Sequence, residues 1–480
     1  MGEGLGRGGD RQAIETMTAP HNLSATDLVA AYARRELSPV EVTTAVLAHI
    51  ERWEPHLCAT WALDPEGALV MAQAAEARWQ RGEPAGAVDG VPTMLKENIA
   101  TRGTPVPLGT AATELVPAAA DAPPAARLRE AGAVFLGKTT MPDYGMLSSG
   151  LSSFHRLARN PWDLRLNPGG SSAGAAAGAA AGYGPLHLGT DIGGSVRLPA
   201  SWCGIFTLKP SLGRIPIYPP YAGRVAGPMT RSVADAALMM GVLSQPDDRD
   251  ATRLPHDPGI AWTDLDRLDL EGLRLGLHLD AGWGMAVDPE VRDAVIAVAR
   301  RFEAEGAIVE PLAPFMTREM ADGMDRFWRM RSWLDISALP PERRDKVLPY
   351  IRQWVASGER LGAAEVFHGF SQMAAMRDAA IAATSRFDFV LSPVAPNVAF
   401  PAEWASPLND PEQPFEHIAF TLPYNMSEQP AASINCGFTA AGLPIGLQIA
   451  GHRHDDLGVL RLSRAWERLR GAQRPWPTPA

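Results

Sequence analysis

Short apolar runs alternate with helix-forming segments along most of this 480-residue chain. We expect strands at 133–136, 186–189, 273–279 and 308–312, and helices at 66–79, 125–131 and 289–305. The pattern is helical almost throughout 317–386. Two further apolar runs, 431–436 and 443–450, are predicted to pair as strands, and a last helix is predicted at 455–470. Such alternation predicts an α/β fold in which helices cover a parallel or mixed sheet.

The composition is typical of a folded protein that acts on small molecules. Hydrophobic residues make up 46% of the chain, and the formal net charge of -10 leaves no global basic field for nucleic acid or an anionic membrane. The most apolar stretch, 173–183, is far shorter than the ~20 residues that span a bilayer. Three scattered cysteines suit reduced thiols, so we expect a cytoplasmic enzyme.

The first twenty residues, 1–20, are predicted to be a flexible tail. They contain Gly4, Gly6 and Gly9 in the spacing of a dinucleotide-binding fingerprint. That fingerprint requires a strand before it and a helix after it, and neither is predicted here. We therefore expect no nucleotide cofactor at this segment.

Lysine is rare in this sequence, which makes each lysine a candidate for a special role. It occurs only at Lys96, Lys138, Lys209 and Lys346, so arginine accounts for 40 of the 44 basic residues (44 minus 4). A buried lysine can lose its proton, whereas an arginine cannot. Lys96 lies in the apolar run 90–99 and is a candidate base; mutational bias is the alternative explanation, and Lys138 and Lys209 are interpreted as structural.

Two glycine-rich segments have the composition of catalytic loops. Residues 167–174 are small and lead directly into an Ala/Gly helix, which permits close backbone approach. Residues 188–197 describe a strand that enters a loop with Gly193 and Gly194 before a short helix. Successive N–H groups in such a loop can stabilise an oxyanion or hold a phosphate. A purely structural glycine turn is the alternative for each segment.

Together, and in this order, Lys96, Gly169-Gly170-Ser171-Ser172 and Gly193-Gly194-Ser195 resemble the amidase signature family. The resemblance covers about 90–232 and returns at 425–451, where 442–448 reads Gly-Leu-Pro-Ile-Gly-Leu-Gln. It implies a single large αβα domain over 21–480, with a twisted mixed sheet covered by helices. Within that domain it implies a signature core at 90–232, a helical cleft or lid region at 317–421, and C-terminal strands and a helix at 425–470.

The resemblance also implies roles for individual residues. Ser195 matches the nucleophile, Ser171 the bridging serine after a cis Gly170–Ser171 bond, and Lys96 the base of an acyl-enzyme mechanism that uses no metal and no organic cofactor. The matching oxyanion-hole amides are those of Ile192, Gly193, Gly194 and Ser195. The bracing positions are Gly170, Ser172, Asp191 and Arg197, and the cleft positions are Tyr144, Gly145 and Met146. Many family members have Asp where this chain has Glu97.

The predicted substrate is a neutral amide, anilide or carbamate with an apolar or aromatic group, with esters as a side activity. No cationic cluster is visible in 144–149, which favours a neutral molecule. The helical region supplies apolar side chains whose spacing favours the core, although any that face the cleft would suit such a substrate: Met320, Met324, Phe327, Trp328, Met330, Trp333 and Trp354. We expect a monomer or a homodimer.

Three alternatives follow from the same residues. The segment 170–174 satisfies G-x-S-x-G, the nucleophile elbow of α/β-hydrolases centred on Ser172, but 161–170 lacks the strand that an elbow requires. His452 and His454 hint at a metal or a catalytic histidine, and a surface helix cap is the favoured interpretation. Finally, the family includes subunits that act only inside a multi-subunit amidotransferase, so the chain is either a free-standing hydrolase or such a subunit.

Overall fold

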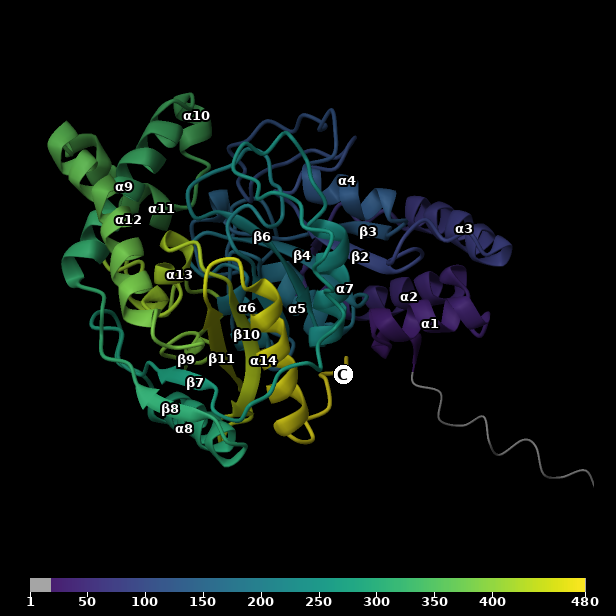
Figure 1. Cartoon of the computed structure of the whole chain (residues 1–480). Coiled ribbons are helices and arrows are strands. Elements are labelled where there is room, and N and C mark those ends of the chain that lie inside the picture. The colour runs from purple at the N-terminus through teal and green to yellow at the C-terminus, as the bar shows by residue number, and fades with distance from the viewer. Residues whose placement is uncertain (1–18, 480) are drawn as a thin grey trace, which may run out of the picture.

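The computed structural model describes residues 19–479 (Figure 1). The glycine pattern at 4–9 and all but the last two residues of the predicted tail lie outside the described residues. The strands are β1 Thr60–Trp61, β2 Pro92–Lys96, β3 Val134–Thr139, β4 Leu186–Asp191, β5 Phe206–Lys209, β6 Val225–Thr230, β7 Arg274–Leu277, β8 Ile308–Pro311, β9 Phe389–Pro393, β10 Ala431–Phe438 and β11 Pro444–Gly451.

These strands form one 11-stranded sheet in the order β1-β3-β2-β4-β6-β5-β10-β11-β9-β7-β8. The pairs β2–β3, β2–β4, β7–β8 and β7–β9 are parallel. The remaining pairs, among them the hairpin β10–β11, are antiparallel. The prediction of a mixed sheet is therefore confirmed.

The helices occupy the segments between the strands. They are α1 Ala25–Arg34, α2 Pro39–Leu57, α3 Pro65–Arg81, α4 Pro123–Glu130, α5 Ala173–Ala181, α6 Arg197–Cys203, α7 Val233–Leu243, α8 Pro289–Ala304, α9 Arg318–Ser337, α10 Pro341–Arg344, α11 Pro349–Ala356, α12 Ala363–Thr384, α13 Leu422–Met426 and α14 Asp456–Leu469. Single 3-10 turns lie at Pro20–Asn22, Asp143–Gly145, Ser357–Arg360 and Glu416–Ile418.

Helices cover both faces of the sheet, as the alternation along β11 shows. Successive side chains of a strand point to opposite faces. Leu447 and Ile449 belong to the main core, which α7, α8 and α14 also line. On the other face, a Cβ at Gly446 would lie 2.4 Å from Ser201 of α6, and Gln448 bonds to Arg197 of α6. The chain is thus a single large α/β domain with the sheet between two helical layers.

The close packing of helix α5 explains why its sequence consists of alanine and glycine alone. Every residue of the helix is buried. A Cβ at Gly174 would lie 2.0 Å from the Ala59 carbonyl oxygen, so a larger side chain has no room there. A helix that is apolar all round belongs in an interior. This close packing fixes the loop that precedes α5, which carries Ser171 and Ser172.

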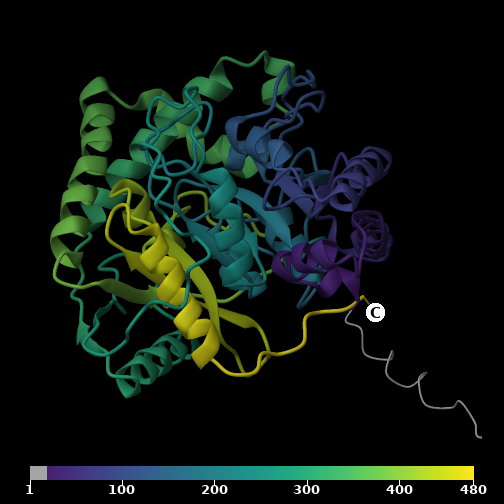
Figure 2. The same ribbon diagram turned by 45° about the vertical axis from the view of Figure 1, so that its right-hand side comes forward.

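The segment predicted to be helical at 317–386 forms a separate side of the molecule. In both views α9 and α12 lie opposite α1 to α3 (Figures 1 and 2). Helices α9, α11 and α12 share an apolar cluster that includes Met324, Trp354 and Met376. This cluster is distinct from the main core, so the helical region has an interior of its own beside the sheet.

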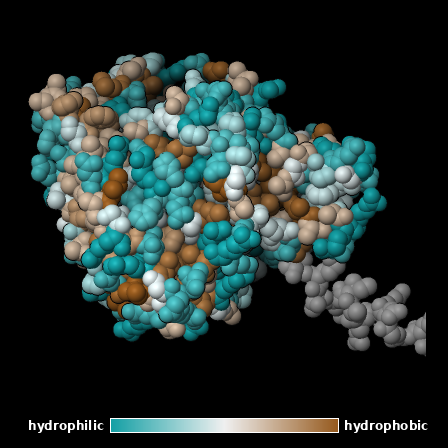
Figure 3. Space-filling model, in the orientation of Figure 1, coloured by the Kyte–Doolittle hydropathy of each residue, from teal (hydrophilic) through white to brown (hydrophobic). Residues whose placement is uncertain are grey.

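On the face seen in Figure 3, hydrophobic residues are interspersed with hydrophilic ones. Among residues 19–479 no helix is both long and apolar enough to cross a membrane. The three cysteines are free thiols in the described part of the chain.

Candidate active site

Neighbouring strands bring the predicted catalytic residues to one edge of the sheet. Lys96 is the last residue of β2, and the loop that carries Ser195 follows β4. Strands β2 and β4 are adjacent and parallel, so both end at the same edge. Ser171 and Ser172 lie immediately before α5, which packs on these strands. Sheet topology therefore gathers three segments that are 24 to 99 residues apart (195 minus 171, and 195 minus 96).

Lys96 contacts two adjacent serines. Its Nζ lies 2.8 Å from Ser171 Oγ and 3.0 Å from Ser172 Oγ. The Ser172 hydroxyl is further engaged by the backbone of Thr190, donating to its carbonyl at 3.2 Å and accepting from its amide at 3.3 Å. Ser172 is fully buried, whereas Ser171 lines a cavity. Ser172 is thus a fixed support of the lysine, and Ser171 is open to a ligand.

Burial and, to a smaller extent, the guanidinium of Arg224 lower the pKa of Lys96 from its ordinary value to about 7. The carboxylates of Asp191 and Glu97 act in the opposite direction without cancelling this effect. Lys138 and Lys209 are also buried, and burial lowers the pKa of each to about 7. The scarcity of lysine therefore identified three buried amines, and the serine contacts distinguish Lys96 from the other two.

The loop after β4 presents unpaired backbone amides beside Ser195. Among the described residues, the N–H groups of Ile192, Gly193 and Ser195 donate to no other group, and Ser195 Oγ makes no hydrogen bond. The Gly194 N–H differs, because it donates to Asp191 Oδ1 at 2.8 Å. Three of the four predicted oxyanion-hole amides are consequently available to a ligand in this conformation.

A buried ion pair holds that loop in shape. The Asp191 carboxylate accepts from both Nε and Nη2 of Arg197, at 3.1 and 3.0 Å, and from the amides of Gly194 and Val196. Both side chains of the pair are fully inaccessible to solvent. Burial alone would raise the pKa of Asp191, but Arg197 and the Asn425 amide hold it well below its usual range.

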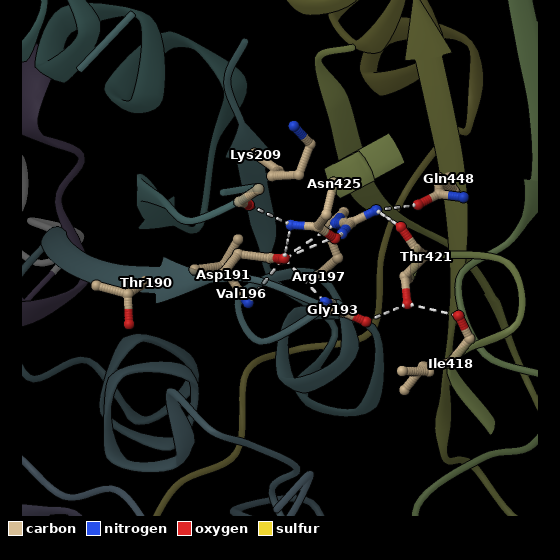
Figure 4. Close-up of polar contacts among 12 residues, drawn as sticks. Thr190, Asp191, Gly193, Val196, Arg197, Lys209, Ile418, Thr421, Asn425 and Gln448 are labelled. Atoms are coloured by element: carbon tan, nitrogen blue, oxygen red, sulfur yellow. Dashed lines mark hydrogen bonds and ion pairs between the residues drawn. The ribbon is translucent and has the colours of Figure 1, made fainter. Parts of the chain in front are cut away.

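The ion pair is completed by C-terminal residues that the sequence did not reveal as site residues. Figure 4 shows Arg197 between Asp191 on one side and Thr421 and Gln448 on the other, with Asn425 bonded to both Asp191 and Arg197. Arg197 Nη1 donates to the Thr421 carbonyl at 2.8 Å and to Gln448 Oε1 at 2.9 Å, while Asn425 Nδ2 donates to Asp191 at 2.8 Å. The family resemblance at 425–451 includes Asn425 and Gln448 but gave neither of them a role in the site.

The structure accounts for Glu97 next to the lysine. Its carboxylate turns away from Lys96, accepting from the Gly109 amide at 3.1 Å and contacting Nε2 of His155 at 2.7 Å. His155 and Glu97 are both buried. The extra methylene of Glu97 therefore serves a neighbouring buried contact, and the two serines that contact Lys96 are in place.

Gly170 has a positional reason to be glycine. A Cβ at this residue would lie 2.5 Å from both the amide nitrogen and the carbonyl oxygen of Ser149. The Gly170–Ser171 peptide bond is cis, as predicted. The backbone of 147–149 thus packs directly against the loop that carries Ser171.

Two connected cavities meet at Ser195. The first encloses about 580 Å³ and is walled mainly by apolar and aromatic side chains, among them Leu147, Trp328, Trp354, Phe415 and Ile418. Tyr144, Gly145 and Met146 line both cavities, as expected for cleft residues. Of the seven apolar side chains singled out in the helical region, only Trp328 and Trp354 reach the first cavity; the others lie away from it.

The second cavity is larger and more polar than the sequence suggested. It encloses about 1510 Å³ beside Ser171 and Ser195. Its walls include Arg224, Arg331 and Asp335 in addition to Tyr218 and Tyr221. Sequence reasoning missed these residues because they come from a proline-rich loop and from α9, neither of which contains a motif.

The alternatives based on other residues find little support in this geometry. The elbow interpretation requires a strand before Ser172, and residues 161–172 form none. Asp455 caps α14 by accepting from the Gly458 amide, which agrees with the helix-cap interpretation of 452–456. Within residues 19–479 no group of three His, Cys, Asp or Glu side chains is arranged to hold a metal.

Comparisons with known proteins agree with the geometry. A family model described as Amidase matches residues 41–460. The chain is 34% identical to a glutamyl-tRNA(Gln) amidotransferase subunit from Solidesulfovibrio magneticus, covering 95% of this chain and 98% of that protein. It is 33% identical to an acylamidase of Rhodococcus erythropolis, covering 95% and 96%.

Solved structures give the same result. A bacterial aryl acylamidase of the amidase signature enzymes superposes with a TM-score of 0.86 at 29% identity, covering 95% of this chain and all of the other. A peptide amidase from Stenotrophomonas maltophilia superposes with a TM-score of 0.80 at 25% identity, covering 95% and 99%.

The buried ion pair leads to a stability prediction. Replacing Arg197 with Met leaves the Asp191 carboxylate buried without its partner, which we expect to destabilise the protein by about 3–5 kcal/mol. Chemical denaturation followed by circular dichroism measures this loss. The matched control is Arg34→Met, which breaks an exposed ion pair with Glu36 and should leave the midpoint unchanged. Equal midpoints for the two variants would contradict the central role of the pair.

Proposed function

The chain belongs to the amidase signature family, and on that premise we propose that it is an amidase whose nucleophile is Ser195. Amidase signature enzymes hydrolyse amides. The observation that carries the proposal is the contact of a buried lysine with Ser171 on the wall of the cavity that Ser195 also lines. No histidine is required in this arrangement, because the neutral amine takes the place of the imidazole base.

The proposed reaction begins with proton transfer away from Ser195. In the neutral form of Lys96, Ser171 donates to Nζ across the 2.8 Å contact. Ser171 in turn accepts the proton of Ser195 as Ser195 Oγ attacks the carbonyl carbon of the amide. The two hydroxyls face the same cavity, and the relay requires them to come within hydrogen-bond reach when substrate is bound.

The free amides of Ile192, Gly193 and Ser195 then stabilise the tetrahedral oxyanion. When the C–N bond breaks, the relay returns a proton to the leaving nitrogen, and an ester to Ser195 remains. Water attacks this ester by the same route and releases the carboxylic acid, which restores Ser195. Asp191 and Arg197 contribute by holding the amide-bearing loop in place.

The apolar cavity supports an aromatic or aliphatic group on the substrate. Trp328, Trp354 and Phe415 line this cavity, and aromatic side chains of this kind pack well against an aryl or aliphatic group. The structural likeness to an aryl acylamidase is consistent with this choice. We infer that amides and anilides are the main substrates, with carbamates and esters hydrolysed by the same nucleophile. A cytoplasmic location and a monomeric or homodimeric state remain predictions.

A second candidate function rests on the sequence relatives. Several relatives at 32–34% identity are named as glutamyl-tRNA(Gln) amidotransferase subunits, and the chain covers almost their full length. In that case the Ser195 site would release ammonia from an amide for a partner protein. The same catalytic chemistry serves both functions, so only the dependence on a partner separates them.

The nucleophile assignment predicts an order of activities among serine variants. Ser195→Ala removes the attacking oxygen, so we expect a loss of roughly 10³-fold or more in kcat on an anilide. Ser171→Ala should lose about 10²-fold or more because the relay is cut. Ser172→Ala should retain more activity than either of them. If Ser172→Ala were inactive while Ser195→Ala stayed active, the nucleophile would be Ser172, as the α/β-hydrolase elbow interpretation requires. Mass spectrometry of the wild type with substrate should find the acyl group on Ser195.

The lowered pKa of Lys96 predicts a pH dependence. Only the neutral amine accepts a proton, so kcat/KM should rise with pH through an apparent pKa of about 7 and level off above it. Lys96→Arg keeps the charge but cannot deprotonate, and it should lower kcat/KM by about 10²-fold or more at every pH. Lys346→Arg, at an exposed position, is the control and should keep the wild-type profile. An active Lys96→Arg enzyme would refute the relay.

The free-standing hydrolase and the amidotransferase component differ in what the purified chain does alone. We expect the purified chain to hydrolyse simple anilides without any other protein, as measured by release of the aromatic amine. Glutamine should be a poor substrate under the same conditions. Activity that appears only after the partner proteins of an amidotransferase are added, with glutamine as the amide, would establish the second function instead.

A further inference from the structure

The larger cavity beside Ser195 differs in character from the apolar one. It is bounded by the proline-rich loop 218–224 and by α9, and it carries two guanidinium groups, those of Arg224 and Arg331. The two cavities meet at Ser195, so a substrate bound there extends into both. If Ser195 is the nucleophile, as proposed above, the walls of this cavity select which amide it attacks.

Arg224 is held at the wall of this cavity by its own loop. Its Nη1 donates to the Pro219 carbonyl oxygen at 3.2 Å, and its backbone amide donates to the Tyr221 carbonyl at 3.0 Å. The preceding residue, Gly223, accepts from Asn425 of the buried network at 3.0 Å. The loop is therefore tied to the structure that shapes the Ser195 loop, and Arg224 is fixed relative to the nucleophile.

Arg331 reaches this cavity from α9 and also lines the smaller cavity, so it lies where the two meet. Its guanidinium carbon lies 4.5 Å from the centroid of the Tyr221 ring, a cation–π contact that joins α9 to the proline-rich loop. Both arginines line this cavity. Burial lowers the pKa of Arg224, and the charge of Arg331 acts in the same direction. Two like charges are thus held near each other at one cavity wall.

Neither arginine is neutralised by the protein. Among the described residues, no carboxylate lies within 4.0 Å of either guanidinium. Of the acidic residues that line the cavity, Asp191 is committed to Arg197, and Asp335 is exposed and forms no ion pair with Arg331. Keeping the partly buried guanidinium of Arg224 without an anionic partner costs free energy, which a bound anion would recover.

We propose, resting on the proposed function, that Arg224 and Arg331 form a carboxylate-binding subsite. The preferred substrate is then an amide with an apolar or aromatic group on one side of the scissile bond and a carboxylate on the other. Guanidinium groups bind carboxylates through paired, charge-assisted hydrogen bonds. The apolar group fills the cavity walled by Trp328 and Phe415, and the carboxylate lies in the second cavity. This replaces the neutral substrate expected from the sequence.

Two pairs of isosteric amides test the proposal. The first pair compares phenylacetylglycine with N-isobutyl phenylacetamide, and the second compares succinanilic acid with isocaproic anilide. Within each pair an isopropyl group replaces the carboxylate, and the product measured is the same, phenylacetate or aniline. We expect kcat/KM for the acid to exceed that for its isostere by roughly tenfold or more in at least one pair. Added salt should lower the value for the acid more than for the isostere.

Variants of α9 assign the preference to the arginines. Arg331 is exposed, so Arg331→Gln should fold, and it should reduce the acid-to-isostere ratio of kcat/KM by roughly tenfold. Asp335→Asn removes a competing negative charge and should raise the ratio. The matched control is Arg326→Gln on the same helix, because Arg326 lines neither cavity and its loss should leave the ratio unchanged. Arg224→Gln should also reduce the ratio, but it will move the pH profile as well because Arg224 lowers the pKa of Lys96.

The outcomes separate this inference from the proposed function. The subsite is overturned, and the amidase assignment is left intact, if the isosteres are hydrolysed in a Ser195-dependent way and neither acid is preferred. The same conclusion follows if an acid is preferred but Arg331→Gln does not change that preference. Calorimetric binding to the Ser195→Ala protein tests the subsite without turnover. The subsite is supported if an acid binds more tightly than its isostere and if this binding is weaker in the Ser195→Ala, Arg331→Gln double variant. This result counts even if no substrate of the panel is hydrolysed. Equal or weaker binding of both acids overturns the subsite.

Discussion

The buried pair of Asp191 and Arg197 is the interaction on which the site depends. A carboxylate and a guanidinium that are both removed from water must satisfy nearly all their hydrogen-bonding groups, and here they do so with the Ser195 loop on one side and with Thr421, Asn425 and Gln448 on the other. Because each partner is fixed by several bonds, the amides of Ile192, Gly193 and Ser195 stay exposed to the cavity. The same network anchors Gly223 and so places Arg224.

Electrostatics link the two ends of the cleft. Burial and the Arg224 charge both lower the pKa of Lys96, so a residue proposed to bind substrate also helps to keep the proposed base neutral. A carboxylate bound at Arg224 would offset part of that charge. The proposed base and the proposed specificity of the larger cavity are thereby physically coupled, whereas the smaller cavity is walled mainly by apolar and aromatic side chains.

Local sequence patterns predicted much of the fold, but they predicted the candidate site only in part. The alternation of apolar runs and helices predicted an α/β fold with a parallel or mixed sheet, and the six predicted strands and the helical region 317–386 were found close to their expected bounds. Strands β1, β2, β5, β6 and β9 were not predicted. The scarcity of lysine pointed to buried amines correctly, but it did not separate Lys96 from Lys138 and Lys209, since all three are buried. The expectation of a neutral substrate came from one segment, 144–149, and overlooked the walls built by other segments.

The sequence by itself determined the class of fold and the order of the glycine and serine motifs, because these are properties of local composition and spacing, and its resemblance to a family singled out Lys96, Ser171 and Ser195 as the proposed catalytic residues. Only the tertiary structure decided which of the predicted amides are free, what surrounds Arg197, and that Arg224 and Arg331 share one cavity. The physical reason is that the contacts of Arg197 with Thr421 and Gln448, and of Arg331 with Tyr221, join segments more than a hundred residues apart through strand order and helix packing. A side chain's partners across those distances leave no periodic or spacing signal in the chain.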